Sequence, residues 1–169
     1  MKTSLKKILP AVLLSVIISF SAFAQTNVSG GIYTNATWTL ANSPYIVVDT
    51  VVVFPGVTLT IQPGVVVKFA NGKYMEIRQA TLMAVGTSVD SITFTSNSAT
   101  PTPGIWLRIN LNNCVQSHFN FCNFYYSSNG VTGASTSGPT FVTFRNSNFR
   151  YNINGHSVLH CIVDTCTFY

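Results

Sequence analysis

The chain has 169 residues, of which 47% are hydrophobic and only 8% are charged, and its formal net charge is +5. Three basic residues lie before position 25, so six basic residues remain against four acidic residues in the rest, a net charge of +2. These charges are scattered, which excludes the basic stripe that nucleic-acid binding requires. The length suffices for one domain with a hydrophobic core.

The N-terminus has the pattern of a secretory signal peptide. Lys2, Lys6 and Lys7 precede an apolar run over residues 8–20, and the small-residue ending Ala22-Phe23-Ala24 follows. A membrane-spanning helix needs roughly 20 apolar residues, more than this run offers. Residues 1–24 are therefore predicted to be cleaved after Ala24. The mature chain is predicted to be secreted or at the cell surface, with no transmembrane segment.

The mature sequence is predicted to be all-β. Val, Ile, Thr, Phe and Tyr dominate it, and these side chains fit a pleated, half-buried surface. Residues 25–44 are polar, with Trp38 and Leu40 as apolar anchors, and are predicted to form an N-terminal cap segment. Strand-like runs then follow at residues 45–48, 50–54, 57–61, 65–70, 74–80, 81–85, 91–95 and 105–111.

Turn signals separate these runs at a regular spacing. Pro55-Gly56-Val57 recurs as Pro63-Gly64-Val65 eight residues later, and Asn71-Gly72 follows after another eight. Strands this short that turn this often favour a solenoid, in which each coil holds two or three strands and stacks on the next.

The C-terminal half contains a second repeat. Residues 119–124, 144–149 and 163–168 share a large apolar residue, two variable positions, Cys or Ser, one polar residue, and then Phe. The spacing is 25 residues from Phe124 to Phe149 and 19 from Phe149 to Phe168. We expect these phenylalanines to form one inward ladder, with Asn, Thr and Ser side chains hydrogen-bonding outside it.

Residues 57–69, 80–87 and 91–96 closely resemble the N-terminal coils of right-handed parallel β-helix repeat proteins of the pectate-lyase-like architecture. The resemblance is strongest to secreted surface proteins of the Bacteroidota type, and it extends over about residues 51–168. It implies a right-handed parallel β-helix for residues 45–169. It defines function poorly, because the same architecture carries lyases, hydrolases, adhesins and stalks.

The cysteines Cys114, Cys122, Cys161 and Cys166 all lie in the exported part, where disulfides can form. In the repeat alignment Cys122 and Cys166 share a column two coils apart, about 9.6 Å at the usual strand spacing. That separation exceeds the roughly 7 Å limit for a bridge. Small buried residues in an inward column are the favoured interpretation, and a disulfide elsewhere stays open.

No complete metal or catalytic site is predicted, and no cofactor. His118, His156 and His160 with Cys161 lack the compact spacing of zinc ligands. The acids Asp49, Glu76, Asp90 and Asp164 are scattered, whereas the resemblance implies clustered acids in lyases and hydrolases. Arg145 and Arg150 could share a face, but a base without a clamp for metal or substrate is weak evidence.

Tyr125, Tyr126 and Tyr151 are the candidate glycan-contacting residues. They follow or lie between the core phenylalanines, where a coil turns outward, and aromatic rings can stack on sugars. Packing of half-buried rings at the coil corners is the alternative, and the sequence favours it.

The pattern therefore favours a non-catalytic secreted or cell-surface scaffold that binds a polysaccharide, a cell-envelope glycan or another surface. The alternative is the N-terminal part of a polysaccharide lyase or glycoside hydrolase whose active site lies beyond residue 169. Because Tyr169 follows a core phenylalanine without a polar cap, the sequence is expected to be a fragment, the alternative being that another chain covers this end. The sequence does not define the oligomeric state.

Overall fold

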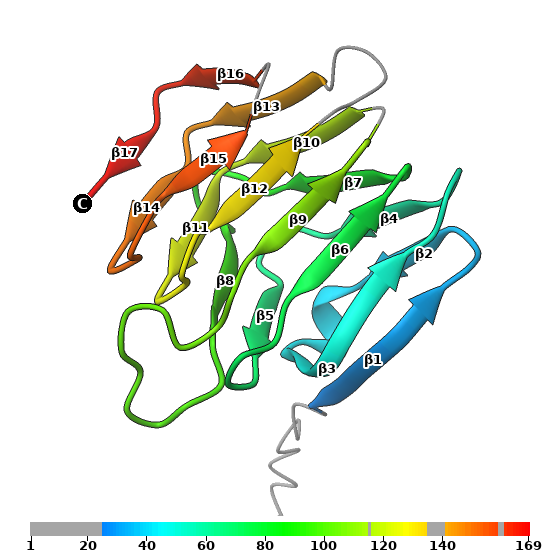
Figure 1. Ribbon diagram of the computed structural model, residues 1–169, viewed down its shortest axis with the longest axis horizontal. Helices are drawn as coiled ribbons and strands as arrows, with labels where there is room; N and C mark the ends of the chain where they lie inside the picture. The colour runs from blue at the N-terminus through cyan, green and yellow to red at the C-terminus, as the bar shows by residue number, and fades with distance from the viewer. Residues whose placement is uncertain (1–24, 115, 135–140, 159–160) are drawn as a thin grey trace, which may run out of the picture.

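The computed structural model describes residues 25–114, 116–134, 141–158 and 161–169 (Figure 1). The predicted signal peptide, residues 1–24, lies outside the described residues, so its cleavage and the export of the chain stay predictions. Among the described residues, no helix is long and apolar enough to cross a membrane. The predicted all-β class is confirmed, with one short 3₁₀ helix (η1, Leu40–Asn42) beside the strands.

The strands follow one another through the whole described chain. Their bounds are β1 (Thr26–Ile32), β2 (Ala36–Trp38), β3 (Tyr45–Val53), β4 (Thr58–Ile61), β5 (Val66–Phe69), β6 (Met75–Arg78), β7 (Thr81–Val85), β8 (Ile92–Ser96), β9 (Ile109–Asn112), β10 (Gln116–Asn120), β11 (Cys122–Tyr125), β12 (Val131–Ala134), β13 (Phe141–Arg145), β14 (Asn148–Arg150), β15 (His156–Val158), β16 (Cys161–Asp164) and β17 (Thr167–Phe168).

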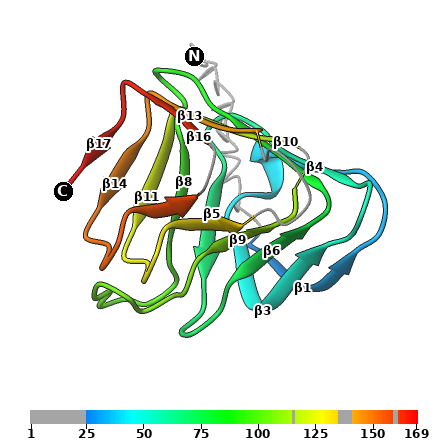
Figure 2. The same cartoon turned by 45° about the horizontal axis from the view of Figure 1, so that its top comes forward.

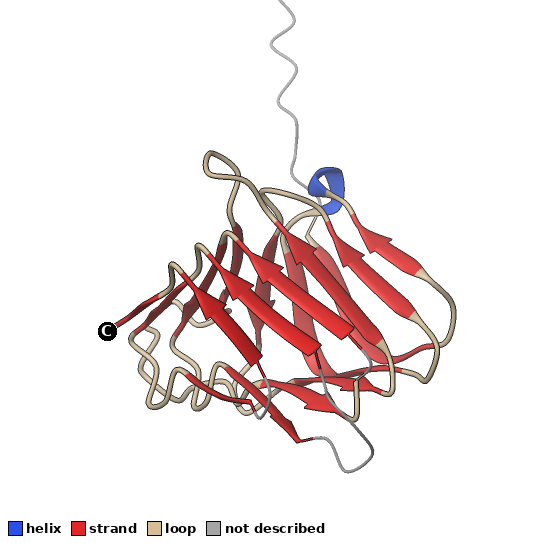
Figure 3. Cartoon of the chain, turned by 90° about the horizontal axis from the view of Figure 1, so that it is seen from above, coloured by secondary structure: helices blue, strands red, loops and turns tan. Residues whose placement is uncertain are grey.

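The strands wind into a parallel β-helix with three faces (Figure 2). The first face contains the start of β3 and then β5, β8, β11, β14 and β17. The second face contains the end of β3 and then β6, β9, β12 and β15. The third face contains β2, β4, β7, β10, β13 and β16. Each strand pairs in parallel with the strand one coil away, so the coils stack side by side (Figure 3).

Several predicted boundaries needed correction. The runs predicted at residues 45–48 and 50–54 form one strand, β3, which bends at the corner and pairs with β5 through Tyr45–Val47 and with β6 through Val51–Val53. The run predicted at 105–111 starts as a strand only at Ile109. Before it, the indole of Trp106 is fully buried and its Nε1 donates to the carbonyl of Tyr125 at 2.7 Å.

The segment predicted as an N-terminal cap already takes part in the coil pattern. β1 pairs in parallel with β3 along its length, and β2 pairs with β4 on the third face. Trp38 is buried as expected and its ring stacks on Tyr45 at 4.7 Å, whereas Leu40 is 48% exposed, so Leu40 is not the predicted anchor.

The predicted phenylalanine ladder is confirmed. Phe124 is paired with Phe149, and Phe149 with Phe168, which gives the expected spacings of 25 and 19 residues. Phe94 extends the ladder by one coil, and successive ring centroids lie 5.0, 4.5 and 4.9 Å apart in nearly parallel planes. The rings of Phe94, Phe124 and Phe149 are fully buried, which makes this ladder the axis of the C-terminal core.

A second aromatic ladder faces the first across the core. Phe119 and Phe144 are paired on the third face, and their rings stack at 5.0 Å. Phe119 meets Phe124 edge to face at 5.7 Å, and Phe144 meets Phe149 in the same way at 5.8 Å. The two ladders therefore fill the space between the first and third faces with alternating stacked and edge-on contacts.

The outward rows include amides and hydroxyls that bond from coil to coil, as predicted. Asn148 Nδ2 donates to Asn123 Oδ1 at 2.9 Å on the first face. Thr132 Oγ1 donates to Asn110 Oδ1 at 3.2 Å on the second face. These bonds join neighbouring coils on the outside, in the same direction as the backbone pairing.

In the last three coils, the short corner between the third and first faces contains one residue with positive φ. Phe121, Asn146 and Thr165 have φ values of 49°, 48° and 54° and occupy equivalent positions in successive coils. This left-handed conformation turns the chain sharply, and it is favourable for Asn but rare for Phe and Thr. The repeated geometry therefore comes from the stacking of coils rather than from local preference.

The Phe124→Ala variant tests the aromatic ladder. Removal of the buried ring leaves a cavity between Phe94 and Phe149, and the free energy of unfolding is expected to fall by about 3–5 kcal/mol in urea titration. Val89→Ala is the matched control, because Val89 is 86% exposed and its truncation should change the free energy by less than about 0.5 kcal/mol. Equal losses in the two variants would contradict a ladder-based core.

His156 gives a second test, through pH. Its ring lies 5.0 Å from Phe168 and 5.9 Å from Phe149, and burial lowers the pKa of this imidazole from its ordinary value of 6.5. The unfolded chain therefore takes up a proton below about pH 6.5 before the folded chain does, and stability falls as the pH drops. His156→Leu should remove this part of the pH dependence in urea titrations. Identical pH profiles for both proteins would contradict the assignment.

Candidate functional site

The three candidate tyrosines lie at the corner that follows the first face. Tyr125 is the last residue of β11, Tyr126 follows it with a φ of 65°, and Tyr151 follows β14 with a φ of 56°. Tyr126 and Tyr151 therefore hold equivalent positions in adjacent coils. We call Tyr125, Tyr126 and Tyr151 the tyrosine corner.

The structure brings these side chains together. The rings of Tyr126 and Tyr151 are stacked, with centroids 5.4 Å apart and planes at 12°. The Tyr125 ring lies 6.3 Å from that of Tyr126 at an angle of 49°. Tyr151 is 56% exposed, whereas Tyr125 and Tyr126 are half-buried and Tyr126 packs against the core. Tyr126 thus anchors the corner from below, and Tyr151 presents the accessible aromatic surface.

A cation lies beside this aromatic surface. Arg150 pairs with Tyr125 across β11 and β14, so the two side chains are neighbours on the outside of the first face. The Arg150 guanidinium carbon lies 4.3 Å from the centroid of the Tyr169 ring, a cation–π arrangement. Within the described part of the chain, Arg150 has no ion pair. The corner therefore combines three tyrosines with an exposed positive charge.

Asn152 fixes the loop that carries Tyr151. Its Oδ1 accepts hydrogen bonds from the backbone N–H of Ser127 at 2.8 Å and from the Ser127 hydroxyl at 2.6 Å. Its Nδ2 donates to the carbonyl of Phe124 at 2.9 Å. Ser127 is fully buried, so these bonds satisfy polar groups that water does not reach. The side chain of Asn152 therefore ties the Tyr151 corner to the coil before it.

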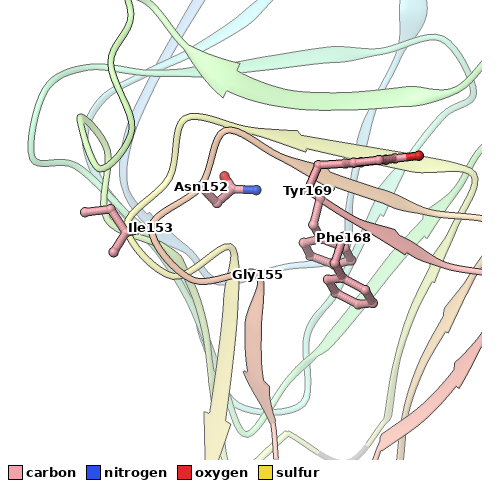
Figure 4. A pocket seen from close by; sticks show the side chains of 6 residues that line it. Asn152, Ile153, Gly155, Phe168 and Tyr169 are labelled. Atoms are coloured by element: carbon pink, nitrogen blue, oxygen red, sulfur yellow. The ribbon is translucent and has the colours of Figure 1, made fainter.

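A pocket of about 300 Å³ lies next to the corner, between the loop after β14 and the last residues of the chain (Figure 4). Asn152 and Ile153 lie on one side of it and Phe168 and Tyr169 on the other, with Gly155 between them. A Cβ atom at Gly155 would come within 2.8 Å of the Phe168 ring, so a larger residue there would displace that ring. Three of the lining residues are aromatic, namely Phe149, Phe168 and Tyr169, and Asn152, which supports the corner, also lines the pocket.

The four acids lie apart, as their scatter in the sequence indicated. Asp49 pairs with Lys73 at 2.9 Å on an exposed edge, and this contact lowers the pKa of the Asp49 carboxyl. Asp90 lies in the turn before β8, where its backbone N–H donates to Thr87 Oγ1. Asp164 ends β16, with its carboxylate 4.0 Å from Nε of Arg145.

Glu76 is the one buried acid among the described residues. Arg78 donates two hydrogen bonds to its carboxylate, from Nε at 2.9 Å and from an Nη at 3.0 Å, and Asn112 donates a third at 2.9 Å. The hydrogen bonds from Arg78 hold the pKa of the Glu76 carboxyl below its ordinary value, against the effect of burial. Glu76 is thus saturated by partners and is held as a structural ion pair.

The histidines do not converge on one point. His118 on β10 forms a 2.7 Å hydrogen bond through Nδ1 with Thr143 Oγ1, whereas His156 packs against the aromatic ladders. His160 lies outside the described residues. Throughout the described ranges, no group of three His, Cys, Asp or Glu side chains is placed to hold a metal ion.

The cysteines follow the predicted column. The register places Ser147 between Cys122 and Cys166, and the Ser147 hydroxyl accepts the backbone N–H of Cys122 at 3.1 Å. The Cys122 thiol is fully buried, donates to the carbonyl of Ala84, and has its pKa raised by burial. Cys114 is buried as well, whereas Cys161 and Cys166 are half-buried.

Sequence reasoning missed three residues of this region. Arg150 was considered only as a base, although it follows Tyr125 by one coil length of 25 residues. Asn152 follows Ser127 by the same 25 residues, and that spacing was the available signal. Tyr169 was read only as the end of the chain, whereas its ring contacts Arg150.

Residues 30–136, more than half of the chain, match the family model of the pectate-lyase-like β-helix domain. The chain belongs to this family. The match confirms the resemblance drawn from the sequence, and the parallel faces of the structure agree with it. No curated protein and no solved structure matches the chain. The family fits a carbohydrate-related surface protein, and it covers the first two tyrosines but not Tyr151.

The Asn152→Ala variant tests how the corner is held. It leaves the buried polar atoms of Ser127 without their partner, and the free energy of unfolding should fall by about 1–3 kcal/mol in urea titration. Asn154→Ala is the matched control from the same loop, because Asn154 is exposed and donates one hydrogen bond, to Asn129. Its expected change is below about 0.5 kcal/mol. A larger loss for Asn154→Ala would contradict the role given to Asn152.

Proposed function

We propose that this β-helix domain is a non-catalytic scaffold of a secreted or cell-surface protein, and that its tyrosine corner binds glycans. The observation that carries the proposal is the stacked pair Tyr126 and Tyr151 with an exposed ring, beside Tyr125 and the cation of Arg150. An accessible aromatic ring supplies a flat apolar surface for a sugar, and its hydroxyl supplies a polar edge.

The rigid support of the corner favours binding. Tyr126 packs on the core, the Tyr125 carbonyl accepts the buried Trp106 indole, and Asn152 fixes the loop after Tyr151. A ligand therefore meets rings that are already held in place, so little conformational entropy is lost on binding. The positive charge of Arg150 favours acidic polysaccharides over neutral ones.

The placement of the acids supports a binding role over a catalytic one within these coils. Glycoside hydrolysis needs two carboxyl groups across one sugar bond, with one of them protonated. Here the Glu76 carboxylate is hydrogen-bonded by Arg78 and Asn112. Asp49 is paired with Lys73. Asp90 lies in the turn before β8, and Asp164 lies at the end of β16.

Membership of the pectate-lyase-like family favours an enzyme as the alternative function. The coils described here would then be the N-terminal part of a polysaccharide lyase or glycoside hydrolase, with the active site beyond residue 169. In that protein the tyrosine corner would hold substrate near a catalytic site formed by later coils.

The Tyr151→Ala variant of the mature chain tests the corner. Affinity electrophoresis in gels containing polygalacturonate, alginate or a neutral glucan is expected to show retardation by an acidic polysaccharide. Tyr151→Ala should weaken it by up to about tenfold, because one stacked ring is worth roughly 0.5–1.5 kcal/mol. Tyr33→Ala is the matched control, since Tyr33 is 69% exposed and lies in the first coil. Equal retardation of the two variants would contradict the proposal.

A second assay separates scaffold from enzyme. The full-length gene product is incubated with the same polysaccharides, with and without calcium, and new reducing ends and unsaturated products are measured. Binding without cleavage supports the scaffold. Cleavage by the full-length product but not by residues 25–169 supports the enzyme alternative and leaves the corner as its substrate-binding part.

A further inference from the structure

A shallow groove lies on the outside of the third face, away from the tyrosine corner. Two rows of outward side chains cross β7, β10 and β13. In one row, His118 on β10 pairs with Thr143 on β13. In the other row, Asn120 on β10 pairs with Val85 on β7 and with Arg145 on β13. The space between these rows measures about 210 Å³ and is lined by Val85, His118, Asn120, Thr143 and Arg145.

Two polar side chains of the groove, His118 and Asn120, are each held by one side-chain hydrogen bond. His118 uses Nδ1 to contact Thr143 Oγ1 at 2.7 Å, which leaves the Nε2 atom of the ring outside that bond. Asn120 accepts from Asn146 Nδ2 through Oδ1 at 3.1 Å, which leaves its own amide N–H groups as donors. The groove therefore combines fixed side chains with donors that remain for a ligand.

The charge and the size of the groove restrict the kind of ligand that it can bind. The Arg145 side chain is 57% exposed, and its nearest anion is Asp164, 4.0 Å from Nε and 60% exposed. Ion pairs of that length and exposure are weak, so the guanidinium keeps most of its capacity to pair with another anion. Val85, 39% exposed, adds an apolar surface at one side. The volume is below the roughly 300 Å³ of pockets for drug-sized ligands, so it suits one small unit.

We propose that this groove binds the carboxylate of a single acidic sugar residue. Arg145 pairs with the carboxylate, while His118, Thr143 and Asn120 hydrogen-bond the hydroxyls and Val85 contacts the apolar face of the ring. The groove lies on a different face and shares no residue with the tyrosine corner, so the proposal does not depend on the function proposed above.

The test uses isotope-labelled mature protein, residues 25–169, titrated with sodium glucuronate and followed by amide and imidazole NMR shifts. We expect millimolar binding with shifts centred on β10 and β13. Arg145→Gln should weaken it about tenfold or more, because a charge-assisted pair is lost. Arg108→Gln, a substitution outside the groove, should bind as the parent does. Equal affinity of Arg145→Gln and the parent would overturn the proposal.

Asp164→Asn gives a change of opposite sign. It removes the competing charge while keeping an oxygen for the hydrogen bond from Thr165. Binding of glucuronate should become several-fold tighter; weaker binding would overturn the role of Arg145.

Two further ligands identify the recognised chemistry. Glucose binding as tightly as glucuronate would overturn the carboxylate contact. If acetate binds more weakly than glucuronate, the result supports recognition of a sugar residue. If the two bind equally, recognition of the sugar is overturned, whereas the carboxylate contact is supported. Tyr151→Ala should leave this titration unchanged, which separates the groove from the tyrosine corner.

Discussion

The parallel pairing of each strand with the strand one coil away is the constraint on which this structure depends. Parallel strands lie about 4.8 Å apart, and equivalent residues of successive coils must therefore occupy columns with that spacing. Flat aromatic rings fill such a column well, because their centroids can sit 4.5 to 5.0 Å apart, as in the Phe94 to Phe168 ladder. The backbone pairing and the side-chain stacking thus support the same geometry.

The same spacing organises the outside of the molecule. Asn123 and Asn148, or Asn110 and Thr132, meet at hydrogen-bond distance because they lie one coil apart. The spacing also determines which cysteines can form a disulfide. Ser147 lies between Cys122 and Cys166, so this column holds small side chains rather than a disulfide. The four acids fall in different columns, and no column gathers them.

The repeat was visible in the sequence because the ladder selects like residues at a fixed spacing. Phe124, Phe149 and Phe168 could be aligned without a structure, and the pairing is the one expected. The start of β9 could not be found, because Trp106 has strand chemistry but is held by its indole at a corner. Arg150 and Asn152 were missed for a similar reason: their role depends on partners 25 to 28 residues earlier, which composition does not reveal.

The connections at the corners of the coil vary in length, most of all at the corner where the candidate site lies. The corner from the third to the first face contains six residues between β7 and β8, but only one or two in the last three coils, where Phe121, Asn146 and Thr165 turn the chain with positive φ. The corner from the first to the second face ranges from five residues after β5 to twelve after β8. Long loops leave the solenoid without changing its register, and side chains in them are free to serve a ligand. Tyr126 and Tyr151 lie at this permissive corner, while Tyr125, Trp106 and Asn152 tie it to the core. A rigid ladder whose coils repeat at equivalent corner positions is therefore sufficient to place aromatic rings at a defined spacing.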